Sequence, residues 1–357
     1  MKRLSWRERQ IDNLREVRWD WMVGMGIRPV ILLSFLLLIG DAAAQEQVLR
    51  TQTTVVLAPT LVKDGKGKLI FGLRANDFTI EDDGVAQTVQ LDQVDLQPVS
   101  LVVALQCGGA AFNEFERMQG LGAMINPLLD QGNTEVAIVK FDSHVTQTTD
   151  FTHDEKLIRG ELRRLRQGDG GAAILDAVNY SVSLLNKTPN DRLRILLLIS
   201  ETRDHGSAVP LANVATAMAG SDIVMYSLAF SPALSQVLDD VRGKNPGKSN
   251  NADILAPILM AAQGMRKNIP KAIATMTGGQ YELFKSAKNF DLRMSQFDND
   301  LYNRYLLSFQ PSDPHPGLHK VEVKLNNPKK HTAIIARTSY WAAPLLPGRV
   351  QNTIEPR

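Results

Sequence analysis

The chain has 357 residues, of which 44% are hydrophobic and 22% are charged. This length and composition suit one large or two ordinary globular domains, and they exclude a disordered or low-complexity chain. The formal net charge is only +2, so no general attraction to nucleic acid or to an anionic membrane follows. With a single cysteine, the core must hold without an intrachain disulfide.

The N-terminal segment has the pattern of a secretory signal. Arg28 precedes the apolar stretch VILLSFLLLIG, and alanines 42–44 supply an A-x-A cleavage pattern. The stretch is too short to span a bilayer, which takes about 20 apolar residues. We therefore expect residues 1–44 to be removed, with 1–21 fitting an extension upstream of the true start. The mature protein is then expected to be exported, to the periplasm, cell surface or medium, without an integral membrane span.

Residues 45–97 are expected to form a small β unit. The segment TQTTVVLAPTLV (51–62) is rich in valine and threonine and predicts a strand. FTIED and AQTVQLDQV alternate around Asp83-Gly84, which indicates a hairpin of two strands.

Residues 98–303 show the alternation of an α/β domain. Continuously apolar runs predict strands buried on both faces at 101–106, 135–141, 193–200 and 222–230. A polar edge strand is expected at 144–151 and a last parallel strand at 280–284. Apolar residues at helical spacing predict helices at 112–130, 154–166, 172–187, 210–219, 269–277 and 289–304. This order predicts a doubly wound, mostly parallel sheet, with a polar surface loop at 243–253.

After residue 303 the strand pattern returns. Alternating segments at 304–311, 319–326 and 331–338 predict strands, and SYWAA (339–343) is expected to pack as a closing strand. We expect residues 304–343 to pack with 45–97 as one small antiparallel, β-sandwich-like domain that flanks the α/β domain. Residues 344–357 are expected to be a tail.

Segment 98–111 resembles the opening strand of a von Willebrand factor A (vWA) domain, and the whole layout is similar to exported vWA-related proteins of acidobacterial type. The similarity covers residues 51–343. The motifs that carry it are Asp64-Gly65, Gly72-Leu73, Asp77-Phe78, Glu81–Gly84, Tyr305–Pro311, His319–Val323 and Tyr340–Ala342.

The resemblance implies a domain that binds protein ligands through a metal-ion-dependent adhesion site. That site uses D-x-S-x-S after the first strand, a threonine in a Gly-Gly-Thr turn, and an aspartate after the fourth strand. Magnesium or manganese needs about six oxygen ligands. The corresponding positions in this chain are Gln106, Gly108, Ala110, Ala172 and Glu201. With three hydroxyls absent, the resemblance implies a degenerate site without metal or other cofactor.

We therefore interpret the chain as a non-enzymatic protein-interaction or scaffold module with an unidentified protein partner. The candidate protein-contact rim consists of Gln106, Gly108, Ala110, Ala172, Glu201 and Asp204. Two alternatives stay open at this point. One is a metal-dependent adhesion protein with coordination rebuilt from Asp169 or Asp204. The other is a thiol hydrolase using Cys107, with His205 as the candidate base on the same rim.

Two further features have ordinary structural interpretations. The arginines between 159 and 166 mix with glutamates at helical spacing and predict a solvated helix face rather than a nucleic-acid patch. Asp176 is expected to lie on the next helix without a special role.

Overall fold

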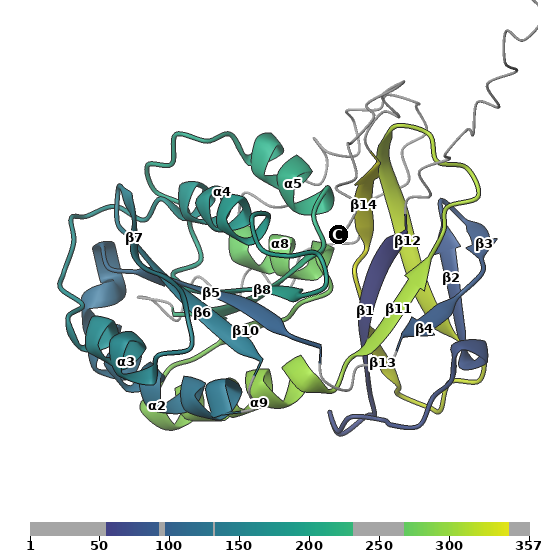
Figure 1. The fold of residues 1–357 in the computed structure, drawn as a ribbon, viewed down its shortest axis with the longest axis horizontal. Helices are drawn as coiled ribbons and strands as arrows, with labels where there is room; N and C mark the ends of the chain where they lie inside the picture. Colours follow the sequence, from purple (N-terminus) through teal and green to yellow (C-terminus); the bar gives the residue numbers. More distant parts are fainter. Residues whose placement is uncertain (1–54, 93–96, 131–132, 231–267, 343–357) are drawn as a thin grey trace, which may run out of the picture. The chain divides into compact units, whose positions relative to one another are not determined.

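A computed structural model describes residues 55–92, 97–130, 133–230 and 268–342 (Figure 1). The predicted signal segment 1–44, the predicted loop 243–253 and the tail 344–357 lie outside these residues. Among the described residues, no helix is both long and apolar enough to cross a membrane.

The α/β part contains a six-stranded sheet in the order β10-β9-β8-β5-β6-β7. All neighbouring strands run parallel except β7, which pairs antiparallel with β6 at the sheet edge. This confirms the predicted doubly wound, mostly parallel sheet. The strands are β5 (Val99–Gln106), β6 (Thr134–Phe141), β7 (Val145–Thr152), β8 (Leu193–Ser200), β9 (Ile223–Ala229) and β10 (Tyr281–Leu283).

Helices cover both faces of this sheet, as Figure 1 shows. One face packs against α2 (Phe115–Asp130), α3 (Glu155–Arg163) and α9 (Ala287–Tyr302), and the other against α4 (Ile174–Leu185), α5 (Leu211–Ala219) and α8 (Ile269–Met276). Every residue of β5 is buried. Its side chains alternate between the two cores, with Leu101, Val103 and Leu105 in one and Val102 and Ala104 in the other. This two-sided burial explains why the strand is continuously apolar.

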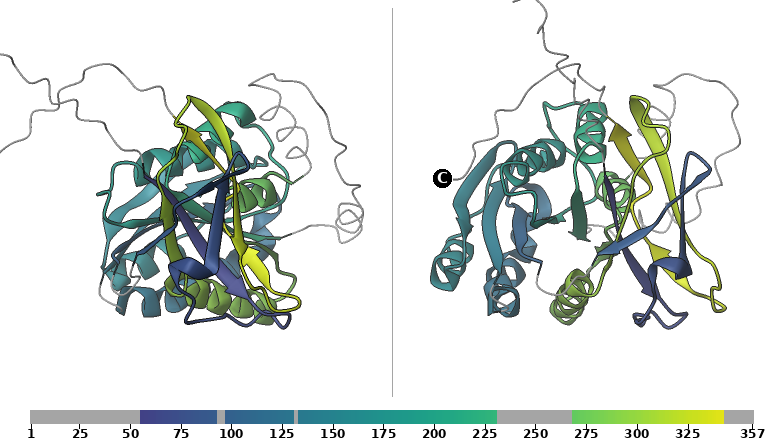
Figure 2. Two further views of the ribbon diagram at one scale, coloured as in Figure 1. Left: turned by 90° about the vertical axis from the view of Figure 1, so that its right-hand side faces the viewer. Right: turned by 45° about the vertical axis from the view of Figure 1, so that its right-hand side comes forward.

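The remaining strands form two antiparallel sheets of four strands each. One has the order β13-β1-β11-β4 and the other β14-β12-β2-β3. Their buried residues form one hydrophobic core, and Figure 2 shows these strands from two further sides. The strands are β1 (Val56–Lys63), β2 (Phe78–Asp82), β3 (Val85–Gln87), β4 (Gln90–Asp92), β11 (Tyr305–Phe309), β12 (Gly317–Leu325), β13 (Ala333–Ile335) and β14 (Ser339–Ala342). A short 3₁₀ helix, η1 (Ala75–Asp77), precedes β2.

Each sheet combines strands from both sides of the α/β part. β1 pairs with β11, and β2 pairs with β12. In one place the prediction of a single strand was wrong. The segment AQTVQLDQV is divided between β3, which pairs with β2, and β4, which pairs with β11 in the other sheet. The strand predicted at 331–338 is shorter than expected, since β13 covers only Ala333–Ile335, and the predicted closing strand is β14, which begins at Ser339 in the other sheet. Alternation is the same in both sheets, so it cannot show where the chain crosses from one to the other.

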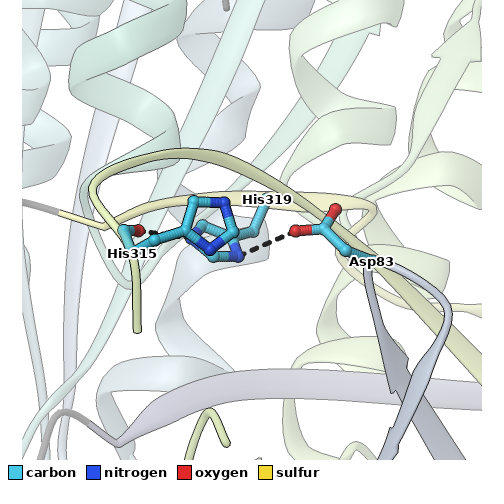
Figure 3. A group of neighbouring side chains, drawn as sticks. All are labelled: Asp83, His315 and His319. Carbon is cyan, nitrogen blue, oxygen red and sulfur yellow. Dashed lines mark hydrogen bonds and ion pairs between the residues drawn. The ribbon is translucent and has the colours of Figure 1, made fainter. Parts of the chain in front are cut away.

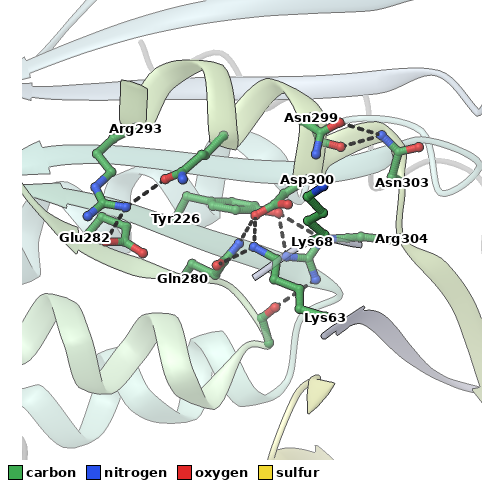
Figure 4. A network of polar contacts seen from close by, with 12 residues as sticks. Lys63, Lys68, Tyr226, Gln280, Glu282, Arg293, Asn299, Asp300, Asn303 and Arg304 are labelled. Carbon is green, nitrogen blue, oxygen red and sulfur yellow. Dashed lines mark hydrogen bonds and ion pairs between the residues drawn. The ribbon is translucent and has the colours of Figure 1, made fainter. Parts of the chain in front are cut away.

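A buried polar network connects β1 with α9 and the end of the parallel sheet (Figure 4). The Lys63 ammonium lies 2.7 Å from an Asp300 carboxylate oxygen and donates to the Gln280 side-chain oxygen at 3.1 Å. Arg304 is 2% exposed, and its Nε donates to the Tyr226 hydroxyl at 2.9 Å. These contacts connect β1 and α9 with β9 and with the segment that precedes β10.

Candidate functional site at the carboxyl edge of the parallel sheet

The candidate site lies where the order of the parallel strands reverses. β5 lies between β6 and β8. The chain continues from β5 to β6 and β7 on one side and then crosses to the other side of β5 to form β8. Gln106 is the last residue of β5, and Glu201 directly follows β8. In doubly wound sheets, ligands bind at the carboxyl ends of the strands at such a reversal.

Gln106 and Glu201 form a closed hydrogen-bonded pair at this edge. The Gln106 Nε2 donates to Glu201 Oε1 at 2.6 Å and to the Gly108 carbonyl at 3.0 Å. The backbone N–H of Glu201 donates to Gln106 Oε1 at 2.9 Å. Gln106 is fully buried and Glu201 is 9% exposed. A backbone N–H can only donate, so the amide oxygen must face it and the amide NH₂ must face the carboxylate. The carboxylate is therefore stabilised by an amide donor.

Two glycines allow the loop after β5 to approach its neighbour closely. A Cβ on Gly108 would lie 2.1 Å from the Gly171 carbonyl oxygen, so no larger residue fits without a shift of backbone. Gly109 has a φ of 55°, and its N–H donates to the Asp169 carbonyl at 2.9 Å. The backbone of residues 107–109 thus packs directly on the loop 168–171. The serine that the resemblance would put at position 108 cannot be accommodated here.

The predicted contact rim is mostly buried. Gln106, Gly108, Ala172 and Glu201 are buried, while Ala110 and Asp204 are half-buried. Buried side chains cannot touch a partner surface, so these four residues cannot themselves form the contact face. They position the loops around them instead.

Ala172 and Asp204 connect the loop before α4 to the loop after β8. Ala172 and His205 exchange backbone hydrogen bonds of 3.1 and 2.8 Å. Asp204 Oδ1 accepts from the backbone N–H of Leu175, in the first turn of α4, at 3.0 Å. This bond holds the Asp204 carboxylate at the N-terminus of α4, where the helix dipole attracts acidic groups.

Asp176 has a role that the sequence interpretation did not give it. Its two carboxylate oxygens accept from the backbone N–H groups of Ala208 and Val209, at 3.0 and 2.8 Å. This carboxylate fixes the loop that precedes α5.

Three titratable side chains at this edge, Asp142, His144 and Asp169, lie close enough together to hold a cation. Their carboxylates already accept backbone hydrogen bonds: Asp142 Oδ1 from His144 at 2.9 Å, and Asp169 Oδ1 from Ser143 and Gly171 at 3.0 and 2.8 Å. The bond from Gly171 is the main reason that the pKa of Asp169 is lowered. These contacts stabilise the loops that carry Asp142 and Asp169.

Cys107 does not have the environment of a nucleophile. The side chain is 3% exposed, and burial raises the pKa of its thiol to about 11. The thiolate, which is the reactive form, is therefore disfavoured at neutral pH. This contradicts the lowered pKa that a thiol hydrolase requires.

Phe112 is the residue that the sequence analysis misplaced. Its spacing predicted the buried face of a helix at 112–130, but the first turn is a 3₁₀ helix, η2 (Gly109–Glu114), and α2 begins only at Phe115. The change of helical period rotates the side chain outward, and Phe112 is 58% exposed. Its exposure could not be inferred from apolar spacing alone.

No protein-family model matches the chain, and no curated protein matches it. Similar solved structures include the vWF domain of the type V pili tip protein Mfa5 from Porphyromonas gingivalis, with 15% identity and a TM-score of 0.27. That match covers 30% of this chain and 38% of the other, so the chain spans less than half of that protein's length. BatB from Bacteroides thetaiotaomicron matches with 16% identity and a TM-score of 0.39, covering 57% of this chain and 98% of BatB. An aerotolerance-related membrane protein from Bacteroides fragilis matches with 18% identity and a TM-score of 0.36, covering 56% and 98%.

Proposed function

We propose that the chain is an exported, non-enzymatic protein-interaction module whose vWA-like α/β domain binds its partner without a metal ion. The observation that carries the proposal is the hydrogen bond from the Gln106 amide to the Glu201 carboxylate at the carboxyl edge of the sheet. Export is supported by the leader pattern of residues 1–44 alone.

A magnesium or manganese ion does not fit the positions where the resemblance places its ligands, which are Gln106, Gly108, Ala110, Ala172 and Glu201. Such an ion needs about six oxygen ligands, several of them carboxylate or hydroxyl. Gly108 and Ala172 offer no side-chain oxygen, and Glu201 Oε1 already accepts from the Gln106 amide. A cation shared by Gln106 and Glu201 would have to lie between their side chains, where the NH₂ group of Gln106 already contacts the Glu201 carboxylate.

A protein partner is supported by the exposed side chains around this closed pair. Phe112, Asp169, Arg203 and His205 are all exposed and belong to three loops. These loops meet near the pair: the Gly109 N–H bonds to the Asp169 carbonyl, and His205 Nε2 lies 3.9 Å from a Glu201 oxygen. Aromatic residues, phenylalanine among them, and arginine are enriched at protein interfaces relative to the rest of the surface. We propose these exposed residues as the contact face, in place of the buried rim.

The metal-free part of the proposal is tested by thermal unfolding of the purified protein. A ligand that binds only the native state raises the melting temperature. We expect the same melting temperature in millimolar magnesium or manganese as in chelator. A metal-dependent rise that Glu201→Gln abolishes would contradict this part of the proposal.

The contact face is tested with two phenylalanine variants. The tagged protein, carrying Phe112→Ala or Phe71→Ala, is used to capture partners from the exported fraction of the source cells. Phe71 is 65% exposed and lies in the β part, so it is a matched control for the loss of a surface aromatic ring. We expect Phe112→Ala to lower the amount of the wild-type partner at least tenfold and Phe71→Ala to leave it unchanged. Equal capture by both variants would show that this face is the wrong one.

A further inference from the structure

Two histidines and two aspartates gather at one end of the β part, far in sequence from the edge described above. Asp82 ends β2, Asp83 occupies the turn to β3, His315 precedes β12, and His319 lies in β12. Figure 3 shows His319 between His315 and Asp83. Ligand atoms of Asp83, His315 and His319 all lie within 4.8 Å of one another.

The centre of the group is a buried imidazole whose tautomer is determined by its surroundings. His319 is 1% exposed, and its Nε2 lies 2.7 Å from the backbone carbonyl of His315. A carbonyl can only accept, so Nε2 carries a proton and donates it. Nδ1 is then the nitrogen with the available lone pair.

That nitrogen faces two carboxylates. Nδ1 of His319 lies 2.9 Å from Asp83 Oδ2 and 3.3 Å from Asp82 Oδ1. Both Nδ1 and Asp82 Oδ1 are buried, and apart from these approaches to each other and to Asp83 neither has a hydrogen-bond partner within the described part of the chain. Asp82 itself is 5% exposed. Unsatisfied buried polar atoms are rare in native proteins and call for a ligand or another explanation.

The second oxygen of each carboxylate is already held. Asp83 Oδ1 accepts from the Lys320 backbone N–H at 2.9 Å, and Asp82 Oδ2 accepts from the Tyr340 hydroxyl at 2.9 Å. The Tyr340 ring also stacks on His319, with ring centroids 4.6 Å apart. Each acidic residue therefore keeps one oxygen fixed by its neighbours and directs the other toward Nδ1. Outer contacts of this kind, including the Nε2–H to carbonyl bond, orient metal ligands in proteins.

A lone pair and two carboxylate oxygens repel one another unless a proton or a metal ion lies between them. A proton on Nδ1 would satisfy one oxygen at a time. A metal ion would satisfy both and would also use the exposed imidazole of His315, whose ring centroid lies 4.2 Å from that of His319.

We propose that Asp83, His315 and His319, with Asp82 Oδ1 as the nearest further oxygen, bind a zinc ion. Imidazole nitrogens with carboxylate oxygens are the donor set that zinc accepts in tetrahedral sites. Ligand atoms of a tetrahedral zinc site are separated by about 3.3 Å, since each lies about 2.0 Å from the metal. The distances of 2.9 and 3.3 Å around Nδ1 are close to this spacing. Such an ion would tie the β2–β3 turn to the loop before β12, and the proposal does not depend on the proposed function of the α/β domain.

The test is zinc titration of the untagged full protein by calorimetry, after dialysis against chelator. We expect one zinc per chain in the wild type, and at least tenfold weaker binding in His315→Ala and in Asp83→Asn. Both variants should fold. His315 lies on an exposed loop, so its truncation leaves no cavity. Asparagine at position 83 keeps the acceptor for the Lys320 N–H and suits the positive φ of 48° there. His144→Ala is the matched control, because it removes an exposed histidine from the other acidic group; it should bind zinc like the wild type.

A second measurement reports the geometry. Cobalt(II) in place of zinc should give the intense visible absorption of a tetrahedral site in the wild type, and His315→Ala should lose it. Failure of the wild type to bind zinc would overturn the proposal and leave a protonated His319 as the partner of the two aspartates. Equal binding by the wild type and His315→Ala, or loss of binding in His144→Ala alone, would overturn it too.

Discussion

Replacing Gln106 with glutamate tests the pair at the centre of the candidate site with almost no change of shape. The substitution Gln106→Glu puts an acidic oxygen where the amide now donates to Glu201 Oε1 at 2.6 Å. Two unit charges at that separation would repel by about 6 kcal/mol at an effective dielectric constant of about 20. Protonation of the introduced carboxyl group avoids this repulsion and restores a hydrogen bond, so it is the cheaper outcome.

The cost of that protonation sets the magnitude. A glutamate in the unfolded chain titrates near pH 4.3, and each pH unit above this value adds about 1.36 kcal/mol. The expected loss of unfolding free energy is therefore about 3.7 kcal/mol at pH 7 and about 1 kcal/mol at pH 5. The introduced group keeps its proton in the folded state and releases it on unfolding, so the variant becomes less stable, relative to the wild type, as the pH rises.

Urea unfolding of the wild type and the variant at pH 5, 6 and 7 measures this difference. Gln119→Glu, which adds the same charge on the half-buried surface of α2, is the control and should change stability by less than about 0.5 kcal/mol at every pH. A loss in Gln106→Glu that is below about 1 kcal/mol at pH 7, or that does not vary with pH, would refute the hydrogen-bonded pair.

Three further outcomes follow from packing and burial. Gly108→Ala should destabilise the protein by several kcal/mol, since the new Cβ would lie 2.1 Å from a carbonyl oxygen. Gly120→Ala, in an open position of α2, should instead stabilise it by up to about 1 kcal/mol. Urea unfolding measures both variants, and equal effects would contradict the close packing at Gly108. Cys107, with its thiol pKa raised to about 11, should react with iodoacetamide at pH 7.5 only as fast as the chain unfolds; labelling at the rate of a free thiol would show that it is accessible. Lys63→Met should cost about 3 kcal/mol in thermal or urea unfolding, because Asp300, 2% exposed, loses its cation; a change near zero would mean that the pair contributes nothing.

Local patterns were enough to predict the elements of the α/β part. A strand that is buried on both faces must be apolar at every position, as LVVALQ and LRILLLIS are, and a helix must repeat its apolar residues at its own period. These constraints act within a few residues, so they can be read without knowing the fold. The mostly parallel, doubly wound sheet follows from their order.

The errors occurred where the apolar pattern fits more than one structure. The segment AQTVQLDQV is divided between β3 in one antiparallel sheet and β4 in the other. Its alternation of apolar and polar residues would be the same in either sheet. Phe112 has the spacing of a buried residue, but a 3₁₀ turn exposes it. A one-dimensional pattern carries no information on either choice.

The sequence by itself predicted that Gln106, Gly108, Ala172 and Glu201 lie at the carboxyl edge of the parallel sheet. Only the tertiary structure decided what these residues do. The hydrogen bond from Gln106 to Glu201 joins positions 95 residues apart. A side chain at Gly108 would collide with the backbone of Gly171 in a neighbouring loop. The same is true of His319, which meets Asp82 and Asp83 only through the pairing of β12 with β2. The sequence gives the type of each residue, but the distances between side chains that are remote in sequence are set by the packing of the folded protein.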